Sequence, residues 1–158
     1  MNEKVKTAEE LVKVRKELQK SGKKMVMTNG CFDVLHGGHI HLFREAKKHG
    51  DILVVALNDD RSIRKLKGSM RPIFNLKERI EILEAVEYID YLIYFKEETP
   101  KRLIAFILPD VLVKGGDWDK DEIVGRKEVE SAGGKAVVVP YLSGYSTTEI
   151  IHKVLQLS

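Results

Sequence analysis

Cysteine is nearly absent from the chain: Cys31 is the only one among 158 residues. A single thiol excludes an internal disulfide and a zinc site built from cysteines alone, and it suits a reducing compartment. Long apolar runs are missing too, since no stretch approaches the roughly 20 residues that a bilayer span requires. The charged N-terminal segment 1–24 has no apolar core of signal-peptide length. We therefore expect a soluble, cytoplasmic protein without a membrane partner.

The chain also lacks a strong charge of either sign. Its 27 Lys and Arg residues against 24 Asp and Glu give a net charge of +3, which suits a small anionic substrate. No dense basic tract carries aromatic residues between its charges, so a nucleic-acid partner is not expected. With 158 residues, 43% of them hydrophobic, the chain suits one domain with its own core. We predict a single domain over 1–158, on which a helix within 1–22 packs.

What the sequence does contain is a regular alternation of short apolar runs and amphipathic segments. The apolar runs predict five strands, at 24–29, 51–58, 90–95, 110–115 and 135–140. The amphipathic segments predict helices at 7–19, 38–49, 75–86, 99–107, 121–134 and 146–156, with a polar, lysine-rich segment at 59–72. This order predicts an α/β fold, a Rossmann-like three-layer sandwich around a mainly five-stranded parallel sheet.

Right-handed crossovers would place the carboxyl ends of all these strands at one edge of the sheet, where ligands bind in such folds. Four loops begin there, after the first, second, fourth and fifth strands. The first loop leads into "TNGCFDVLHGGHIHLF" at 28–43, which holds three of the five histidines and three glycines. We expect these four segments to form one site.

The three histidines raise three alternatives: a metal site, a phosphate site or no site at all. His39 and His41 would lie about 200° apart on a helix, and the His-Glu-x-x-His pattern of zinc proteases is absent, so zinc is not expected. The Gly-x-Gly-x-x-Gly and Walker patterns are absent as well. A helix that starts after a strand still offers free N–H groups to an anion. His36 and His39 would add two donors, and Gly37 and Gly38 would let the backbone approach a phosphate.

At this point the sequence resembles a known family. "HGGH" at 36–39 matches the His-x-Gly-His signature of the cytidylyltransferase-like nucleotidyltransferases, and "YSTTEI" at 145–150 resembles their second signature. Nearly the whole chain, including "KLKGSMRP" at 65–72 and "LVKGGDW" at 112–118, is similar to the adenylyltransferase domain of the bacterial heptose enzymes.

The resemblance implies the HxGH nucleotidyltransferase type of the fold and a specific reaction. The enzyme would transfer AMP from ATP to D-glycero-β-D-manno-heptose 1-phosphate, giving pyrophosphate and ADP-heptose for lipopolysaccharide core or related glycans. Mg²⁺ would accompany ATP, held largely by phosphates and water rather than by protein ligands. Relatives in the family often form homodimers, so a homodimer is expected here as well.

The resemblance also implies roles for particular residues. The expected catalytic residues are His36, His39, Lys65 and Lys67. The expected nucleotide-binding residues are Thr28, Asn29, Gly30, Cys31, Phe32, Gly38, Asp117, Ser146, Thr147 and Thr148. The expected substrate-binding residues are Arg71, Lys114 and Trp118.

Several of these residues also have a purely structural interpretation. The lysines could be solvated, Trp118 could be a packing anchor, and Ser146 could serve only as a helix cap. Arg79 is as compatible with a surface ion pair to Glu78 as with a phosphate contact. Asp33 is expected to bond loop N–H groups, and the three remaining histidines, at 41, 49 and 152, are expected at the surface or in packing.

The chain departs from the family in one place that bears on the nucleotide. Glycerol-3-phosphate cytidylyltransferases carry an arginine before the second signature, whereas "YLSGYSTT" at 141–148 has Tyr141 there, which argues against CTP. The kinase half of the fused heptose enzymes is missing, so we expect a separate transferase. The rival functions are another family activity, such as glycerol-3-phosphate cytidylyltransferase or FAD synthetase, and a nucleotide-binding sensor that is not an enzyme.

Overall fold

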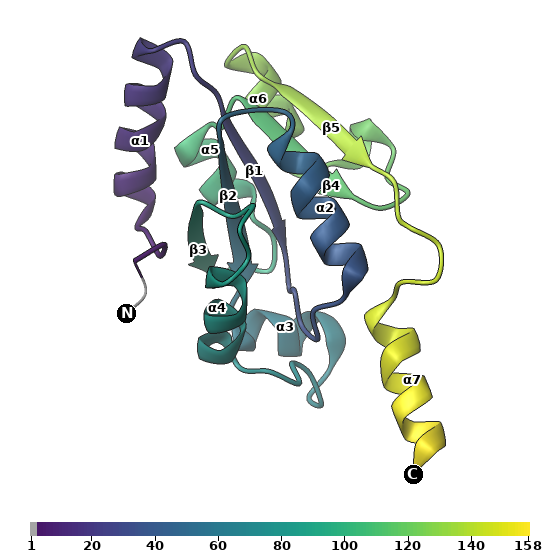
Figure 1. The fold of residues 1–158 in the computed structure, drawn as a ribbon. Coiled ribbons are helices and arrows are strands. Elements are labelled where there is room, and N and C mark those ends of the chain that lie inside the picture. The colour runs from purple at the N-terminus through teal and green to yellow at the C-terminus, as the bar shows by residue number, and fades with distance from the viewer. Residues whose placement is uncertain (1–2) are drawn as a thin grey trace.

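The computed structural model describes residues 3–158 (Figure 1). Its strands are β1 Met25–Gly30, β2 Ile52–Asn58, β3 Tyr91–Phe95, β4 Val111–Gly115 and β5 Lys135–Val139. Its α-helices are α1 Ala8–Lys20, α2 Gly37–Lys47, α3 Asp60–Lys67, α4 Leu76–Glu84, α5 Lys101–Ile107, α6 Arg126–Ser131 and α7 Thr147–Leu157. A short 3₁₀ helix, η1, covers Lys120–Glu122.

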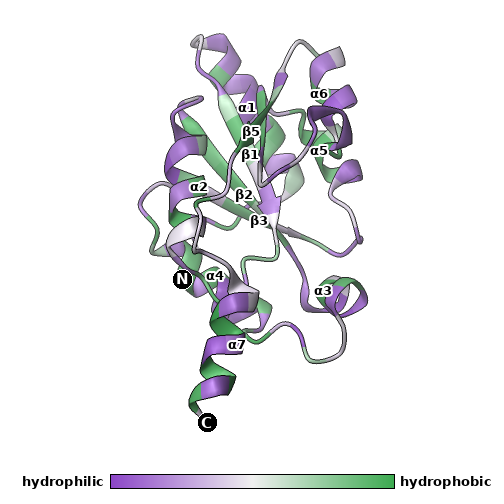
Figure 2. Ribbon diagram, turned by 90° about the vertical axis from the view of Figure 1, so that its right-hand side faces the viewer, coloured by the Kyte–Doolittle hydropathy of each residue, from purple (hydrophilic) through white to green (hydrophobic). Residues whose placement is uncertain are grey.

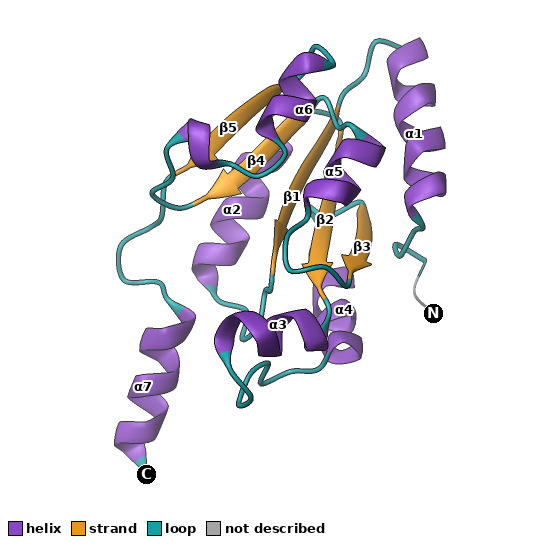
Figure 3. Ribbon diagram, turned by 180° about the vertical axis from the view of Figure 1, so that it is seen from behind, coloured by secondary structure: helices purple, strands orange, loops and turns teal. Residues whose placement is uncertain are grey.

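The five strands form one parallel sheet in the order β3-β2-β1-β4-β5. All carboxyl ends therefore meet at one edge, as Figure 3 shows, and the strand order reverses between β1 and β4. This point is where open α/β sheets bind ligands. The predicted α/β, Rossmann-like fold with a five-stranded parallel sheet is confirmed.

Helices cover both faces of the sheet, which explains why the strands are apolar on both sides. Phe43 of α2 and Leu83 of α4 pack with Val26 and Val55 on one face. Leu11 of α1 and the apolar side chains of α5 and α6 pack on the other. The two cores share the strands between them, so the described chain forms three layers (Figure 1).

The N-terminal helix is fastened to the sheet at both its start and its middle. Thr7 caps α1 with Glu10 in a capping box, as the sequence predicts. Leu11 is fully buried, and α1 lies beside α5. Just before α1, Val5 forms a parallel bridge with Leu92 of β3. The helix expected within 1–22 therefore packs on the sheet layer.

Two predicted segments differ from the structure. The polar segment 59–72 contains a helix, α3, because Asp59 caps it and Ile63 is buried beneath it. The helix predicted over 121–134 is instead η1 and the shorter α6, since Gly125 lies between them with φ of 89°. Side chains rarely tolerate that conformation, so the α-helix cannot run through residue 125.

The last helix, α7, projects from the body of the molecule (Figures 1 and 2). None of its residues is buried, and Val154, Leu155 and Leu157 are 59%, 64% and 80% exposed. Figure 2 shows hydrophobic and hydrophilic residues alternating along it. Within residues 3–158, no helix combines the length and apolar character that crossing a membrane requires.

Candidate active site

A cavity of about 810 Å³ lies at the carboxyl edge of the sheet, over the point where the strand order reverses. Loops after β1, β3, β4 and β5 and parts of α2, α3 and α7 line it. Fourteen of the seventeen predicted site residues lie in its wall: Asn29, Gly30, Cys31, Phe32, His36, Gly38, His39, Lys67, Arg71, Lys114, Trp118, Ser146, Thr147 and Thr148. The topology thus brings together the segments that the sequence predicts to meet.

The loop from β1 to α2 is strained. Phe32 and Val34 have φ values of 49° and 50°, a region that bulky and β-branched residues rarely enter. Each such residue costs on the order of 1–3 kcal/mol and persists only where surrounding contacts hold it. Asp33 between them is buried and accepts from the backbone N–H groups of Ile73 and Phe74 at 2.7 and 2.9 Å. The expectation that Asp33 bonds loop N–H groups is confirmed.

His36 and His39 hold each other at the start of α2. His36 Nδ1 accepts from the Gly38 N–H at 3.0 Å, and His39 Nδ1 accepts from the His36 N–H at 3.1 Å. The two rings lie 3.9 Å apart between centroids, and Phe32 meets the His39 ring edge-on at 5.6 Å. An Nδ1 that accepts carries no proton, so the proton of each neutral ring lies on Nε2. Both imidazoles are therefore fixed as Nε2–H donors.

The environment also keeps both rings neutral. Burial and, to a smaller extent, the nearby His36 and Lys67 lower the pKa of His39 to about 4. Burial lowers the pKa of His36 as well. Neutral N–H donors suit an anion whose negative charge is already balanced by a bound cation.

The backbone N–H groups at the start of α2 differ from the expectation that they are free. The Gly38 N–H is occupied by His36 Nδ1, and the His39 N–H donates to the His36 carbonyl at 3.0 Å. These two N–H groups at the start of α2 are thus satisfied within the turn rather than left for a phosphate. The imidazole Nε2–H groups remain as side-chain donors at this turn.

Arg79 is a structural residue that sequence reasoning misplaced. It is 1% exposed and donates to the carbonyls of Phe74, Cys31 and Asn58 at 2.8–3.1 Å and to Asp60 at 2.8 Å. The guanidinium forms no surface pair with Glu78, and its protein partners occupy its donors. Arg79 instead ties the ends of β1 and β2 to α3 and α4 beneath the cavity.

Three basic residues line the cavity. Arg71 pairs with Asp33 at 3.1 Å, which holds its guanidinium at the wall. The Lys114 ammonium lies 5.4 Å from the Trp118 ring centroid, a cation–π contact. Burial lowers the pKa of Lys114; nearby Cys31 opposes this effect and Lys67 adds to it. The wall between β1 and β4 is therefore suited to an anionic ligand.

The start of α7 faces the same cavity. Ser146 caps the helix by accepting from the Glu149 N–H at 3.3 Å. The Thr147 hydroxyl contacts the carbonyls of Asp33 and Val34 at 3.1 and 3.3 Å. Because that hydroxyl donates to the loop, its proton is not free for a ligand in the cavity.

Three predicted site residues do not line the cavity. Thr28 is fully buried in β1, and its hydroxyl has no hydrogen-bond partner in the described part of the chain. Lys65 is exposed on α3, on a different side of the helix from Lys67, and Asp117 is exposed after β4. The roles of these three residues remain predictions, since the sequence gives the loop to which a residue belongs but not the side to which it points.

Other cavity residues were missed. His41, expected at the surface or in packing, lines the wall, as do Asn58, Tyr141 and Tyr145. Asn58 donates to Ser62 at 3.0 Å, and its place at the end of β2 was the available signal. The two tyrosines lie in the loop before α7, where aromatic side chains give no pattern that distinguishes a wall from a solvated turn.

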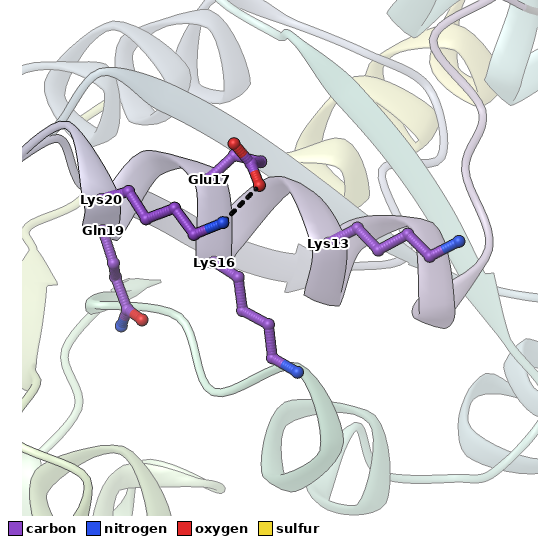
Figure 4. A pocket seen from close by; sticks show the side chains of 5 residues that line it. All are labelled: Lys13, Lys16, Glu17, Gln19 and Lys20. Carbon is purple, nitrogen blue, oxygen red and sulfur yellow. Dashed lines mark hydrogen bonds and ion pairs between the residues drawn. The ribbon is translucent and has the colours of Figure 1, made fainter.

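A second hollow, of about 520 Å³, runs along α1 (Figure 4). Lys13, Lys16, Glu17, Gln19 and Lys20 line it, all from one exposed helix, and only Glu17 and Lys20 are drawn in contact. It combines no second element and no buried polar group, so it is not a site. Among residues 3–158, no group of three or more His, Cys, Asp or Glu is placed to hold a metal ion.

The parallel sheet and the paired histidines at a helix start define a class of protein. The chain belongs to the cytidylyltransferase-like family, whose model matches residues 27–153.

More particular relatives share most of the chain. It is 50% identical over 153 residues to the bifunctional protein HldE of Histophilus somni, covering 97% of this chain and 31% of the relative. It is 49% identical over 152 residues to HldE of Escherichia coli K12, covering 96% of this chain and 32% of that protein. The chain thus spans about a third of the length of these curated relatives.

Two solved structures resemble the fold. A lipopolysaccharide core biosynthesis protein from Thermoplasma volcanium is 31% identical with a TM-score of 0.63, and the match covers 79% of this chain and 100% of that one. Pantoate–β-alanine ligase from Francisella tularensis is 18% identical with a TM-score of 0.59, covering 96% of this chain and 77% of that one. The second likeness shows the fold alone.

Proposed function

We propose that the chain is an adenylyltransferase that transfers AMP from ATP to D-glycero-β-D-manno-heptose 1-phosphate. The products would be pyrophosphate and ADP-heptose for lipopolysaccharide core or related glycans. The observation that carries the proposal is the convergence of His36, His39, Lys67 and the start of α7 on one cavity. The identity of about 50% to HldE proteins supports the substrate, as does the likeness to a lipopolysaccharide core biosynthesis protein.

The reaction needs no nucleophilic side chain. A phosphate oxygen of the sugar phosphate attacks the α-phosphorus of ATP in line and forms a new P–O bond. The bond from that phosphorus to the β-bridging oxygen breaks, and pyrophosphate leaves with the electron pair. The attacking phosphate is already anionic, so no general base is required. Catalysis then rests on positioning and on stabilising negative charge.

The residues of the cavity suit this task. The Nε2–H groups of His36 and His39 would donate to phosphate oxygens on which charge develops, and Lys67 would neutralise the leaving group. Arg71 and Lys114 would hold the sugar phosphate beside Trp118. Mg²⁺ would enter as part of the MgATP substrate, since no cluster of protein ligands in the described chain fits it.

A pyrophosphate-release assay tests the proposal with ATP and CTP against heptose 1-phosphate, glycerol 3-phosphate and FMN. Turnover of ATP with heptose 1-phosphate supports it. Turnover of CTP with glycerol 3-phosphate, or of ATP with FMN, would assign one of the rival family activities. Nucleotide binding without turnover of any acceptor would support the alternative function, a nucleotide-binding sensor that is not an enzyme.

The homodimer and the cytoplasmic location remain predictions. Light scattering on the purified chain measures the first, and a monomer at all concentrations contradicts it. Fractionation of the producing cell measures the second.

A further inference from the structure

The start of α7 is attached to the body of the protein by very few contacts. No residue of α7 is buried, and the helix projects away from the other elements (Figure 1). Apart from bonds to its neighbours Ser146 and Ser158, Thr147 alone within residues 3–158 joins α7 to the rest of the molecule by hydrogen bonds, through its hydroxyl. The place of the second helix start over the cavity therefore depends on contacts in its first turn and just before it.

Tyr145, immediately before the cap, fills a space that the glycine pair leaves open. A Cβ atom on Gly37 would lie 2.7 Å from Tyr145 Cε1, and one on Gly38 would lie 2.9 Å from Tyr145 Cβ. Real Cβ atoms essentially never approach other heavy atoms within 3.0 Å. The tyrosine can pack on the start of α2 because neither residue there carries a side chain.

The same tyrosine lies beside a proposed donor. The rings of His36 and Tyr145 are near parallel, at 23°, with centroids 6.2 Å apart, and His39 lies 3.9 Å from His36 between ring centroids. Tyr145 thus contacts the turn that orients His36, while the next residues, Ser146 and Thr147, begin α7. One residue joins the two helix starts.

We propose that Tyr145 is a positioning residue that holds the start of α7 against the start of α2, with Gly37 and Gly38 as its seat. This inference rests on the proposed function, since it assigns Tyr145 the task of setting the distance between His36 and the α7 N–H groups that face the nucleotide. It also gives the absence of side chains at Gly37 and Gly38 a second purpose, room for Tyr145, besides the predicted approach of a phosphate.

A double-mutant cycle tests the seat with Gly37→Ala, Tyr145→Ala and the variant with both changes. Gly37 is chosen because the three atoms nearest to its added Cβ all belong to Tyr145, whereas a Cβ at Gly38 also meets the His36 ring at 2.8 Å. Each single change should lower kcat/KM for ATP by roughly 10- to 100-fold, because misplacement by about 1 Å costs about 10²-fold. In the Tyr145→Ala background, Gly37→Ala should cost less than about threefold, since the clash is gone.

Matched variants separate positioning from general damage. Tyr145→Phe keeps the ring in the seat and should retain kcat/KM within about threefold. Tyr94→Ala removes a tyrosine of similar exposure, 46% against 48%, from β3 and should leave kcat/KM unchanged. The urea midpoint of each variant shows whether it remains folded.

Two results would overturn the proposal: Tyr145→Ala within about threefold of the unchanged protein, or losses of the two single changes that multiply in the double variant. Calorimetric affinity for a non-hydrolysable ATP analogue repeats the cycle without the acceptor. If the unchanged protein turns over no sugar phosphate, the proposed function fails. The cycle in analogue affinity then supports the positioning role if it shows the same coupling and refutes it if affinity is unchanged.

Discussion

At the scale of single residues, the tautomer of His39 decides how the site can act. Its Nδ1 accepts from the His36 N–H at 3.1 Å, so its Nε2 carries the proton. Glutamine at this N3 position can accept from the cap N–H and present an amide donor, as in a capping box.

We therefore expect His39→Gln to keep more activity than His39→Ala. Loss of one charge-stabilising donor costs about 10²–10³ in kcat, whereas the glutamine variant should lose only about tenfold, since it retains an N–H donor. Pyrophosphate release under saturating substrates measures kcat. Equal activity of the two variants would refute the role of a neutral donor.

The same histidine predicts a pH dependence of stability. Its pKa falls from an ordinary value of 6.5 to about 4 in the folded protein, chiefly through burial. Between these values the unfolded chain binds a proton that the folded chain does not, so stability falls as the pH falls. The contribution is complete above pH 6.5 and is lost as the pH falls toward 4. Urea midpoints at high and low pH should differ less in His39→Gln than in the unchanged protein.

Lys114 predicts a selective effect on the acceptor. It is partly buried, it lies over Trp118, and its ammonium has no carboxylate partner among the ion pairs of residues 3–158. A charge-assisted hydrogen bond contributes about 1.5–3 kcal/mol, so Lys114→Met should raise KM for the sugar phosphate by at least about tenfold. KM for ATP should change little, and initial rates at varied concentrations of each substrate separate the two. A rise in KM for ATP alone would indicate that Lys114 contacts the nucleotide rather than the sugar phosphate.

At the scale of elements, Arg79 holds the floor of the cavity. Its guanidinium satisfies the carbonyls of Cys31, Asn58 and Phe74 and pairs with Asp60. Arg79→Met leaves these carbonyls without a donor, and each buried unsatisfied group costs about 1–3 kcal/mol. We expect a loss of at least about 3 kcal/mol in the free energy of unfolding, measured in urea. Asp60→Asn is the control and should cost less, since that side chain is 30% exposed.

The elements themselves were largely predictable from the sequence. Buried parallel strands read as apolar runs, and caps such as Thr7 and Asn75 act through neighbours three residues away. Short helices were less predictable, because α3 has a single apolar anchor in Ile63 and the helix at 121–134 depends on the φ of Gly125.

The wall of the site was predictable by loop but not by side chain. His36 and His39 could be predicted because the His-x-Gly-His spacing coincides with a turn and the start of a helix. Arg79 reaches Cys31 across 48 positions, and Tyr145 reaches Gly37 across 108, so no local pattern reveals these contacts. Residues that hold a site together across the fold are therefore the ones that a single sequence conceals.

At the scale of the whole molecule, the question is whether α1 belongs to the same cooperative unit as the site. Leu11 is fully buried in the core that lies on the face opposite α2, and Trp118, the only tryptophan, lies at the cavity, 43% exposed. Since the two cores share the strands of one sheet, we predict that helix content and Trp118 fluorescence are lost in one transition in urea.

Leu11→Ala tests that unity, because truncation of a buried leucine costs about 2–5 kcal/mol. If α1 is integral, the substitution shifts the circular-dichroism and fluorescence midpoints equally, although Trp118 lies at the cavity rather than beside Leu11. If α1 unfolds by itself, circular dichroism gains an early step that fluorescence lacks, and the single domain over 1–158 is wrong. Saturation with ATP provides a second test. At 100 times its Kd, a ligand raises the free energy of unfolding of the unit that contains the site by about 2.7 kcal/mol. ATP should therefore stabilise α1 against urea only if α1 belongs to that unit.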